Sequence, residues 1–306
     1  MGDFSADRAI TAGFRLIGRE PLAFLAWVVA YLAVGVAPQM GVFALIIPQW
    51  IRLTQEVAAN AVSNSPMNTA ELMRAQFGLM QLQPLIWITS LVSHALVFGA
   101  VYRAVLFPED RRFFYLRLSG RELWLGLVML VLLVMAFLLL LVVMVPTGIL
   151  IGLVSALGRE APGVQLLAVP VMFAAFAGVI WVLLRLSLAP PQSFAERGFR
   201  LYESWDLTRG QAGKMFLVVL AFVVLLWLAE IILGAVVLGM VGGFAGLQAL
   251  ETWARRPHWD FAAMAPWIVA GGLAVGVLST AFMTLFAAGW AEIYRELTAE
   301  AKPAAA

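Results

Sequence analysis

The sequence predicts an all-α integral membrane protein with six transmembrane helices. Hydrophobic residues make up 63% of the 306 residues and charged residues only 12%, whereas a soluble domain is about half apolar and about a quarter charged. The apolar residues gather in six long stretches, and each has the roughly 20 residues needed to cross the hydrocarbon core of a bilayer. Lysine and arginine fall mainly on one side of the path that these stretches trace.

The six stretches take up most of the chain, so we expect a single transmembrane domain over residues 1–306 without a separate soluble domain. The first stretch is too long for the apolar region of a signal peptide, and no clear cleavage site follows it. We therefore expect it to remain in the mature protein as the first span. The predicted spans are Leu22–Ile47, Leu85–Leu106, Leu123–Leu157, Val164–Ala189, Met215–Gly243 and Pro266–Ile293.

The positions of the basic residues predict the orientation of the chain. Of the 20 lysine and arginine residues, 15 lie in the terminal segments and in the second and fourth connections. Because cytoplasmic loops carry the excess of basic residues, we predict a multi-pass protein of the bacterial inner (cytoplasmic) membrane with both termini in the cytoplasm. These 15 residues are Arg8, Arg15, Arg19, Arg103, Arg111, Arg112, Arg117, Arg121, Arg185, Arg197, Arg200, Arg209, Lys214, Arg295 and Lys302.

Short segments that precede the odd-numbered spans resemble one another. Phe14–Glu20 reads F-R-L-I-G-R-E and Leu116–Glu122 reads L-R-L-S-G-R-E, while Gly198–Leu201 repeats the G-F-R-L of Gly13–Leu16. One interpretation is three two-helix repeats, and the other is convergence, because every span that leaves the cytoplasm attracts arginine at its cytoplasmic end. The repeats would cover residues 1–110, 111–190 and 191–300.

Two segments are predicted to form amphipathic helices at the membrane interface. The first covers residues 5–17. The second covers residues 193–207, where Ser193 and Glu196 form a capping box after Pro190 and Pro191. Such helices turn their apolar faces toward the acyl chains, and their basic side chains then either bind lipid headgroups or only anchor the loops. The candidate headgroup contacts are Arg15, Arg117, Arg197, Arg200 and Arg209.

Two ionisable residues fall near the middle of predicted spans, His94 in the second and Glu230 in the fifth. A charge at this depth costs about 2.5–3.5 kcal/mol on insertion scales, so it usually has a partner or a water-filled cavity. The two spans run in opposite directions, and a contact between His94 and Glu230 is therefore geometrically feasible. The pair predicts either a proton or substrate path, or a neutral glutamate that is hydrogen-bonded inside the bundle.

The sequence contains no motif that would indicate an enzyme. The absence of cysteine excludes disulfides and thiolate sites, and two histidines argue against a histidine-built metal site. Serine-hydrolase elbows, zinc-protease motifs and dinucleotide fingerprints are absent. We therefore predict a protein without catalytic residues, a cofactor or a metal. Basic residues are not interleaved with aromatic ones on a soluble surface, so we also predict that it binds no nucleic acid.

Two short segments are similar to segments of a bacterial six-span family. They are Ser204–Gly210, which precedes the fifth span, and Trp290–Leu297, which ends the sixth. The family is labelled the membrane domain of glycerophosphoryl diester phosphodiesterases. The resemblance implies a membrane-lipid setting rather than catalysis, because the His-Arg-Gly motif and the clustered acidic metal ligands of the soluble phosphodiesterase are absent.

These observations give two hypotheses for function. The first is a non-enzymatic inner-membrane protein that organises or senses membrane lipid or supports a membrane partner. The second is a small-molecule or proton-coupled transporter or channel that uses the pair of His94 and Glu230. The expected partners are membrane lipids, together with a second copy of the chain or another membrane protein.

Overall fold

The computed structural model describes residues 3–46, 73, 77–78, 80–157, 168–240 and 261–301. Six segments in this part of the chain are long and apolar enough to cross a membrane, which confirms the predicted fold class. The protein is therefore a multi-pass helical membrane protein. The six segments are Pro21–Ile46, Gln83–Leu106, Arg112–Leu153, Pro170–Glu196, Ala212–Ala235 and Val269–Ala299.

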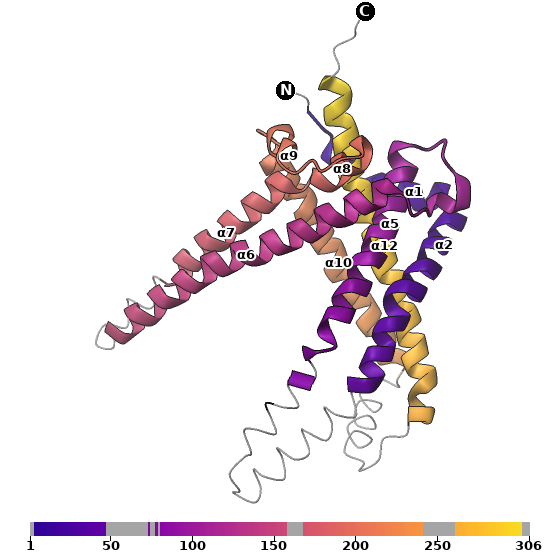
Figure 1. Cartoon of the computed structure of the whole chain (residues 1–306), viewed down its shortest axis with the longest axis horizontal. Coiled ribbons are helices and arrows are strands. Elements are labelled where there is room, and N and C mark those ends of the chain that lie inside the picture. The colour runs from indigo at the N-terminus through magenta and orange to yellow at the C-terminus, as the bar shows by residue number, and fades with distance from the viewer. Residues whose placement is uncertain are drawn as a thin grey trace, which may run out of the picture.

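The helices that build these spans are joined by short helices and turns (Figure 1). The first span continues from α2 through a π-helical turn, and a 3-10 turn precedes α6. The elements are α1 (Ala6–Arg19), α2 (Pro21–Tyr31), the π turn (Leu32–Val36), α5 (Gln83–Leu106), the 3-10 turn (Arg112–Tyr115), α6 (Gly120–Leu157), α7 (Ala168–Leu186), α8 (Ala189–Glu196), α9 (Glu203–Leu207), α10 (Ala212–Met240) and α12 (Phe261–Ala301).

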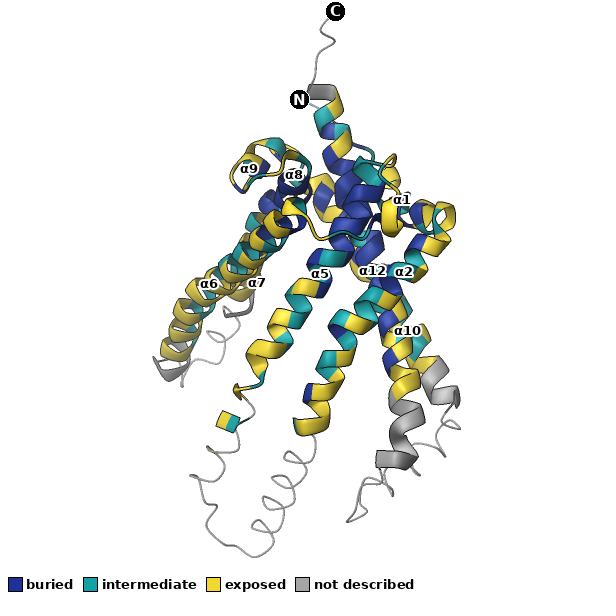
Figure 2. Ribbon diagram, turned by 45° about the vertical axis from the view of Figure 1, so that its right-hand side comes forward, coloured by how far each residue is buried: buried dark blue, intermediate teal, exposed yellow. Residues whose placement is uncertain are grey.

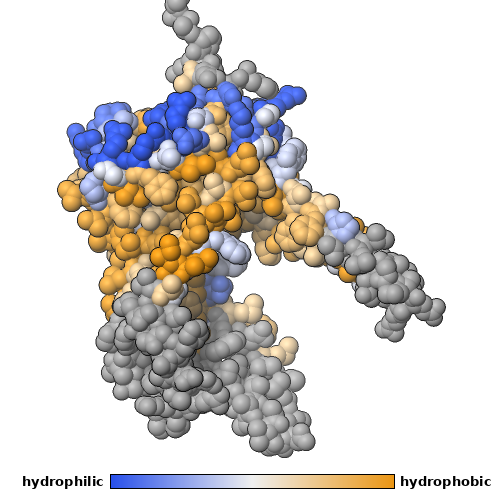
Figure 3. Space-filling view, turned by 180° about the vertical axis from the view of Figure 1, so that it is seen from behind, coloured by the Kyte–Doolittle hydropathy of each residue, from blue (hydrophilic) through white to orange (hydrophobic). Residues whose placement is uncertain are grey.

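The buried core lies at one end of the molecule. The short helices α1, α8 and α9 gather there, while α2, α5, α10 and α12 run away from it and α6 and α7 leave at a wide angle (Figure 1). Buried residues concentrate at this end, and the spans become exposed with distance from it (Figure 2). Figure 3 shows a hydrophilic band over the same end and a hydrophobic surface below it. We call this end the basic end, because the described members of the 15 basic residues lie there.

Together with α7, which packs against it, helix α6 departs steeply from α2, α5, α10 and α12 (Figure 1). Its 38 residues correspond to about 57 Å at a rise of 1.5 Å per residue, almost twice the ~30 Å of the hydrocarbon core. A helix with an apolar stretch longer than the bilayer is thick tilts to keep that stretch in the hydrocarbon. The side chains along α6 are mostly exposed and hydrophobic, as lipid-facing side chains are expected to be.

Helix α1 crosses the C-terminal part of α12 through a face of small residues. Ala9, Ala12 and Gly13 are buried there, and a Cβ atom built on Gly13 would overlap the backbone Cα of Leu285. On the other side, a Cβ on Gly289 would lie 3.0 Å from the carbonyl oxygen of Ala9. The two helices are therefore in backbone-to-backbone contact, which only small side chains permit.

Polar contacts fix the beginning of α1 in the same place. The backbone nitrogen of Ser5 donates to Glu296 Oε2 at 2.7 Å, and Arg8 Nε lies 3.0 Å from Glu296 Oε1. Lys214 of α10 donates to the Asp3 carboxylate, and this hydrogen bond holds the pKa of Asp3 below its usual value. The predicted helix over residues 5–17 is confirmed, and its small-residue face packs on α12. The placement of its apolar face at the membrane interface stays a prediction.

The prediction of one helix over residues 193–207 is wrong. Helix α8 already begins at Ala189 and contains both prolines in its first turn, where the missing N–H costs nothing because it would have no helical partner. The helix ends at Glu196, and the next residue, Arg197, caps it in a left-handed conformation with φ 55°. Ser193 is therefore inside α8, and its Oγ accepts a hydrogen bond from the Arg200 backbone nitrogen at 2.9 Å.

The structure gives one point in common between two of the proposed repeats. Glu20 and Glu122 occupy the same position in the matching segments, and both bind an arginine, Arg111 and Arg103 respectively. The local backbone differs, since the segment before Glu20 is helical and residues 116–118 are not. The three-repeat interpretation stays a prediction.

Candidate functional sites

A buried ion pair joins the end of α5 to the start of α6 at the basic end. Arg103 is 2% exposed and Glu122 is 5% exposed. Arg103 Nη2 donates to Glu122 Oε1, and Arg103 Nη1 donates to the carbonyl oxygen of Tyr115 at 2.6 Å. The other carboxylate oxygen, Glu122 Oε2, accepts hydrogen bonds from the Ser119 nitrogen at 2.9 Å and from Ser119 Oγ at 2.6 Å. Both buried charges are thus paired, as their burial requires.

The same arginine supports a strained turn that faces outward. Phe113, Phe114 and Tyr115 have φ values of 52°, 55° and 66°, a region that costs residues with a Cβ about 1–3 kcal/mol each. Trp27 Nε1 donates to the Phe114 carbonyl at 2.8 Å, and Arg103 holds the Tyr115 carbonyl. The turn presents Phe113, which is 78% exposed, beside Arg112. An exposed aromatic next to an arginine is typical of a segment that enters the membrane interface.

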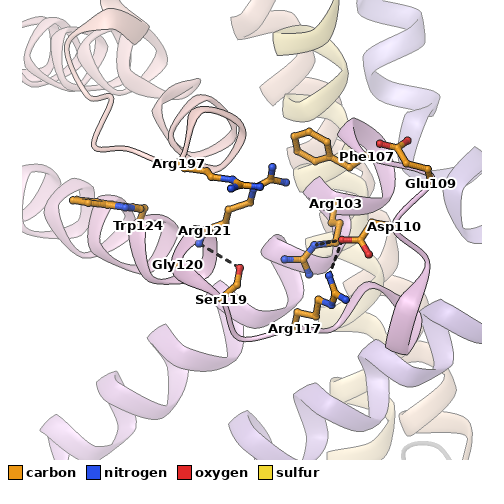
Figure 4. Close-up of a pocket in the computed structure, with 10 residues that line it drawn as sticks. All are labelled: Arg103, Phe107, Glu109, Asp110, Arg117, Ser119, Gly120, Arg121, Trp124 and Arg197. Carbon is orange, nitrogen blue, oxygen red and sulfur yellow. Dashed lines mark hydrogen bonds and ion pairs between the residues drawn. The ribbon is translucent and has the colours of Figure 1, made fainter.

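A pocket of about 490 Å³ opens next to this ion pair, where α5, α6 and the end of α8 meet (Figure 4). Four arginines and two carboxylates contribute to its wall, together with aromatic side chains. We call it the arginine pocket. Its lining residues are Arg103, Phe107, Glu109, Asp110, Arg117, Ser119, Gly120, Arg121, Trp124 and Arg197.

Two of the four arginines are neutralised by nearby carboxylates. Asp110 Oδ2 accepts a hydrogen bond from Arg117 Nη1 at 2.9 Å and lies 3.7 Å from Arg103 Nε. The charge of Arg103 is also balanced by Glu122 behind the pocket wall. The second lining carboxylate, Glu109, lies across the pocket from Arg197, beyond Phe107 (Figure 4).

The other two arginines, Arg121 and Arg197, face the pocket without an acidic partner. Their side chains lie beside each other in Figure 4, and neither forms a salt bridge or a hydrogen bond with the described residues. The Arg121 guanidinium sits 4.0 Å from the centre of the Phe107 ring, and its buried Nε has no hydrogen-bond partner. Burial disfavours the charge of Arg121, and the charges of Arg197 and Arg103 add repulsion. Glu122 and Asp110 offset part of this repulsion without forming a salt bridge. An anion between the two groups would relieve this repulsion.

The structure separates the arginines that were predicted to contact headgroups. Arg117 and Arg197 line the arginine pocket, whereas Arg15, Arg200 and Arg209 are exposed outside it. Arg200 lies 3.0 Å from Glu196 and 2.7 Å from Glu203.

The hydrogen bond from Arg200 lowers the pKa of Glu203. Arg200 is thus neutralised by its neighbours, unlike Arg197.

Arg121 was not among the predicted contacts. Its place next to Glu122 in the second G-R-E segment was the only signal in the sequence that pointed to it.

A second cavity, of about 480 Å³, lies within the spans and brings together the two ionisable residues of the sequence analysis. His94 of α5 and Glu230 of α10 both line it, together with residues of α2 and α12. The two side chains form no hydrogen bond with each other. His94 Nδ1 instead lies 2.6 Å from the carbonyl oxygen of Ser90. We call this space the membrane cavity.

The segment Ser204–Gly210 connects α9 to the end of α7 through side-chain contacts. The hydroxyl groups of Ser204 and Thr208 donate to the Arg185 carbonyl at 3.1 Å and 3.0 Å, and the Arg185 guanidinium lies 4.8 Å from the centre of a Trp205 ring. These contacts tie α9 to the end of α7. In the described part of the chain, no three His, Asp or Glu side chains come together in a way that could hold a metal ion.

Comparison with known protein families, with characterised proteins and with solved structures finds no match to this chain. The class that the fold defines is therefore the multi-pass helical membrane protein described above. The resemblance to the membrane domain of glycerophosphoryl diester phosphodiesterases stays a prediction.

Proposed function

We propose that this protein is a non-enzymatic membrane protein whose basic end binds anionic phospholipid headgroups in the arginine pocket. The observation that carries the proposal is the pair of guanidinium groups of Arg121 and Arg197, which face one pocket without an acidic partner among the described residues. Guanidinium groups bind phosphate through paired, charge-assisted hydrogen bonds. A phosphodiester headgroup supplies the negative charge and the acceptor oxygens that both groups lack.

The surroundings of the pocket favour a lipid over a soluble anion. Trp124, near the start of α6, lines the pocket, and an indole at a span end is typical of the headgroup level of a bilayer. The exposed Phe113 and Leu118 flank the same segment. A lipid whose headgroup enters the pocket would keep its acyl chains beside the hydrophobic surface that begins directly below the basic end (Figure 3).

The proposal predicts that removal of both unpartnered charges weakens binding of anionic lipid. The double variant Arg121→Gln/Arg197→Gln is expected to raise the Kd for phosphatidylglycerol at least about 10-fold, because a hydrogen bond to a charged group contributes about 1.5–3 kcal/mol. The measurement is titration of the detergent-purified protein with short-chain phosphatidylglycerol and, as the zwitterionic reference, phosphatidylcholine.

Arg200→Gln is the matched control, since Arg200 is at the same end but is already paired with Glu196 and Glu203. It is expected to leave the Kd within about twofold of the native value, because exposed ion pairs contribute about 0–1 kcal/mol. Inorganic phosphate, added as a competitor, separates a lipid site from a general anion site. An unchanged Kd in the double variant would contradict the proposal.

The second candidate function is transport through the membrane cavity. The specific observation in its favour is that His94 and Glu230, from spans that run in opposite directions, line the same cavity. A proton-coupled transporter needs such ionisable groups within its spans. If the native protein carries protons across proteoliposome membranes under an imposed pH gradient, Glu230→Gln is expected to abolish that flux, as reported by an entrapped pH-sensitive dye. Equal flux in the variant would exclude a relay through Glu230.

A further inference from the structure

The membrane cavity combines one carboxylate with several aromatic rings. Its wall includes Tyr31 of α2, His94 and Phe98 of α5, Glu230 of α10, and Phe282 and Phe286 of α12. Among the described residues, no lysine or arginine lines it, and the remaining ones are apolar except Ser279. Its volume of about 480 Å³ lies within the range of roughly 300–1,000 Å³ that is typical of small-molecule sites.

Glu230 lacks a counter-charge within the described residues. Its side chain forms no hydrogen bond or salt bridge with them, and the residue is exposed although it lies well inside an apolar span. A carboxylate at this depth is costly without a partner or a water-filled cavity, and a cationic ligand would be such a partner. Because the residue is exposed on the span, a ligand can reach it from the bilayer.

The aromatic rings add a second preference for a cation. The His94 ring lies 6.2 Å from the Tyr31 ring and 6.1 Å from the Phe98 ring, measured between centres. Phe282 stacks on Phe286 at 6.2 Å. The faces of such rings carry partial negative charge and attract organic cations. An anion would meet the carboxylate of Glu230 and no lysine or arginine among the described lining residues, so it is disfavoured.

His94 is placed to accept rather than donate a hydrogen bond in the cavity. Its Nδ1 lies 2.6 Å from the Ser90 carbonyl oxygen, which can only accept, so Nδ1 is the donor in this hydrogen bond. In the neutral ring, Nε2 is then left as an acceptor. A ligand that carries N–H groups can therefore bind both Glu230 and His94. A neutral imidazole adds no positive charge that would compete with such a ligand.

The first span widens directly beside the cavity. The π turn begins at Leu32, the residue after Tyr31, and such turns are frequent at functional sites. Gly35 of this turn packs against Ser93. A Cβ atom at position 35 would lie only 2.9 Å from Ser93 Oγ, so a larger residue does not fit there. The turn thus allows α2 to approach α5 closely at the level where Tyr31 and His94 meet.

We propose that the membrane cavity binds a lipophilic organic cation, a molecule with an apolar body and a single positive charge, with Glu230 as its counter-ion. The inference concerns the cavity of the second candidate function and names its class of ligand. It is independent of the arginine pocket. Binding of the cation is measured without a gradient, so it is tested separately from transport. If the cavity binds the cation but the protein transports nothing, only the transport function is contradicted.

The test uses two probe ions of the same shape and opposite charge. Tetraphenylphosphonium is expected to bind saturably to the purified native protein in detergent, measured by equilibrium dialysis at increasing probe concentration. Tetraphenylborate is expected to show only the non-saturable partition that detergent alone gives. Equal saturable binding of both ions would overturn the proposal, because it would mean that hydrophobic contact and not charge determines occupancy.

Variants of Glu230 complete the test. Glu230→Gln, which keeps size and removes charge, is expected to raise the Kd for tetraphenylphosphonium at least about 10-fold, while Glu230→Asp retains saturable binding. Glu203→Gln, which removes an exposed carboxylate at the basic end, serves as the matched control and is expected to bind as the native protein does. A native Kd in a monodisperse Glu230→Gln protein would overturn the proposal.

Discussion

Replacing Arg103 with alanine is expected to destabilise the protein by about 3–5 kcal/mol, because the change leaves a buried charge without its partner. Glu122 is 5% exposed and would keep only the hydrogen bonds from Ser119. The carbonyl of Tyr115, in the strained turn, would also lose its donor. The loss therefore combines an unpaired carboxylate with the release of a turn that needs external support.

The effect can be measured by thermal unfolding in detergent, followed by tryptophan fluorescence. Arg200→Ala is the matched control, since this arginine is exposed and paired with exposed glutamates, and such pairs contribute about 0–1 kcal/mol. The double variant Arg103→Met/Glu122→Gln removes both charges and is expected to recover part of the lost stability. If Arg103→Ala were no less stable than Arg200→Ala, the structural role of the pair would be excluded.

Replacing Gly13 with alanine is expected to displace α1 from α12. The new Cβ would overlap the Leu285 backbone Cα and lie 3.0 Å from the Leu285 nitrogen. Overpacking typically costs about 1–3 kcal/mol, and backbone atoms cannot rotate away as a side chain can. We expect a cost at the upper end of that range, together with faster proteolysis of the N-terminal segment, both measured on the purified protein.

Gly18 provides the control within the same helix. No atom lies within 4 Å of a Cβ built on Gly18, so Gly18→Ala should only gain helix propensity, about 0.8–1.0 kcal/mol. The two substitutions have the same chemistry and opposite expected signs. A Gly13→Ala protein that matched or exceeded the native stability would show that α1 does not rest on α12 as described.

The spans could be predicted from sequence because their signal is local. A run of apolar residues such as Leu123–Leu157 predicts a span without reference to its neighbours. The proximity of His94 and Glu230 could also be predicted, because the depth of each residue in the membrane follows from its position along its span. Both features depend on distance along one helix, which the sequence gives directly.

The arginine pocket could not be predicted, because it depends on which segments meet in space. Arg121 and Arg197 are separated by two spans, and the sequence gives no sign that the end of α8 returns to the start of α6. The extent of α8 was wrong for a related reason. Pro190 and Pro191 fit either a helix stop or the first turn of a helix, and burial of Phe194 in the core favours the second.

The contact between α1 and α12 has a consequence for biosynthesis. The hydrogen bond from Ser5 to Glu296 joins residues 291 positions apart, and a ribosome adding about 5–20 residues per second needs roughly 15–60 s to make that interval. During this time the small-residue face of α1 has no helix to pack on. An amphipathic helix in that condition can lie on the membrane surface, and α1 can pack on α12 only after the sixth span has been made.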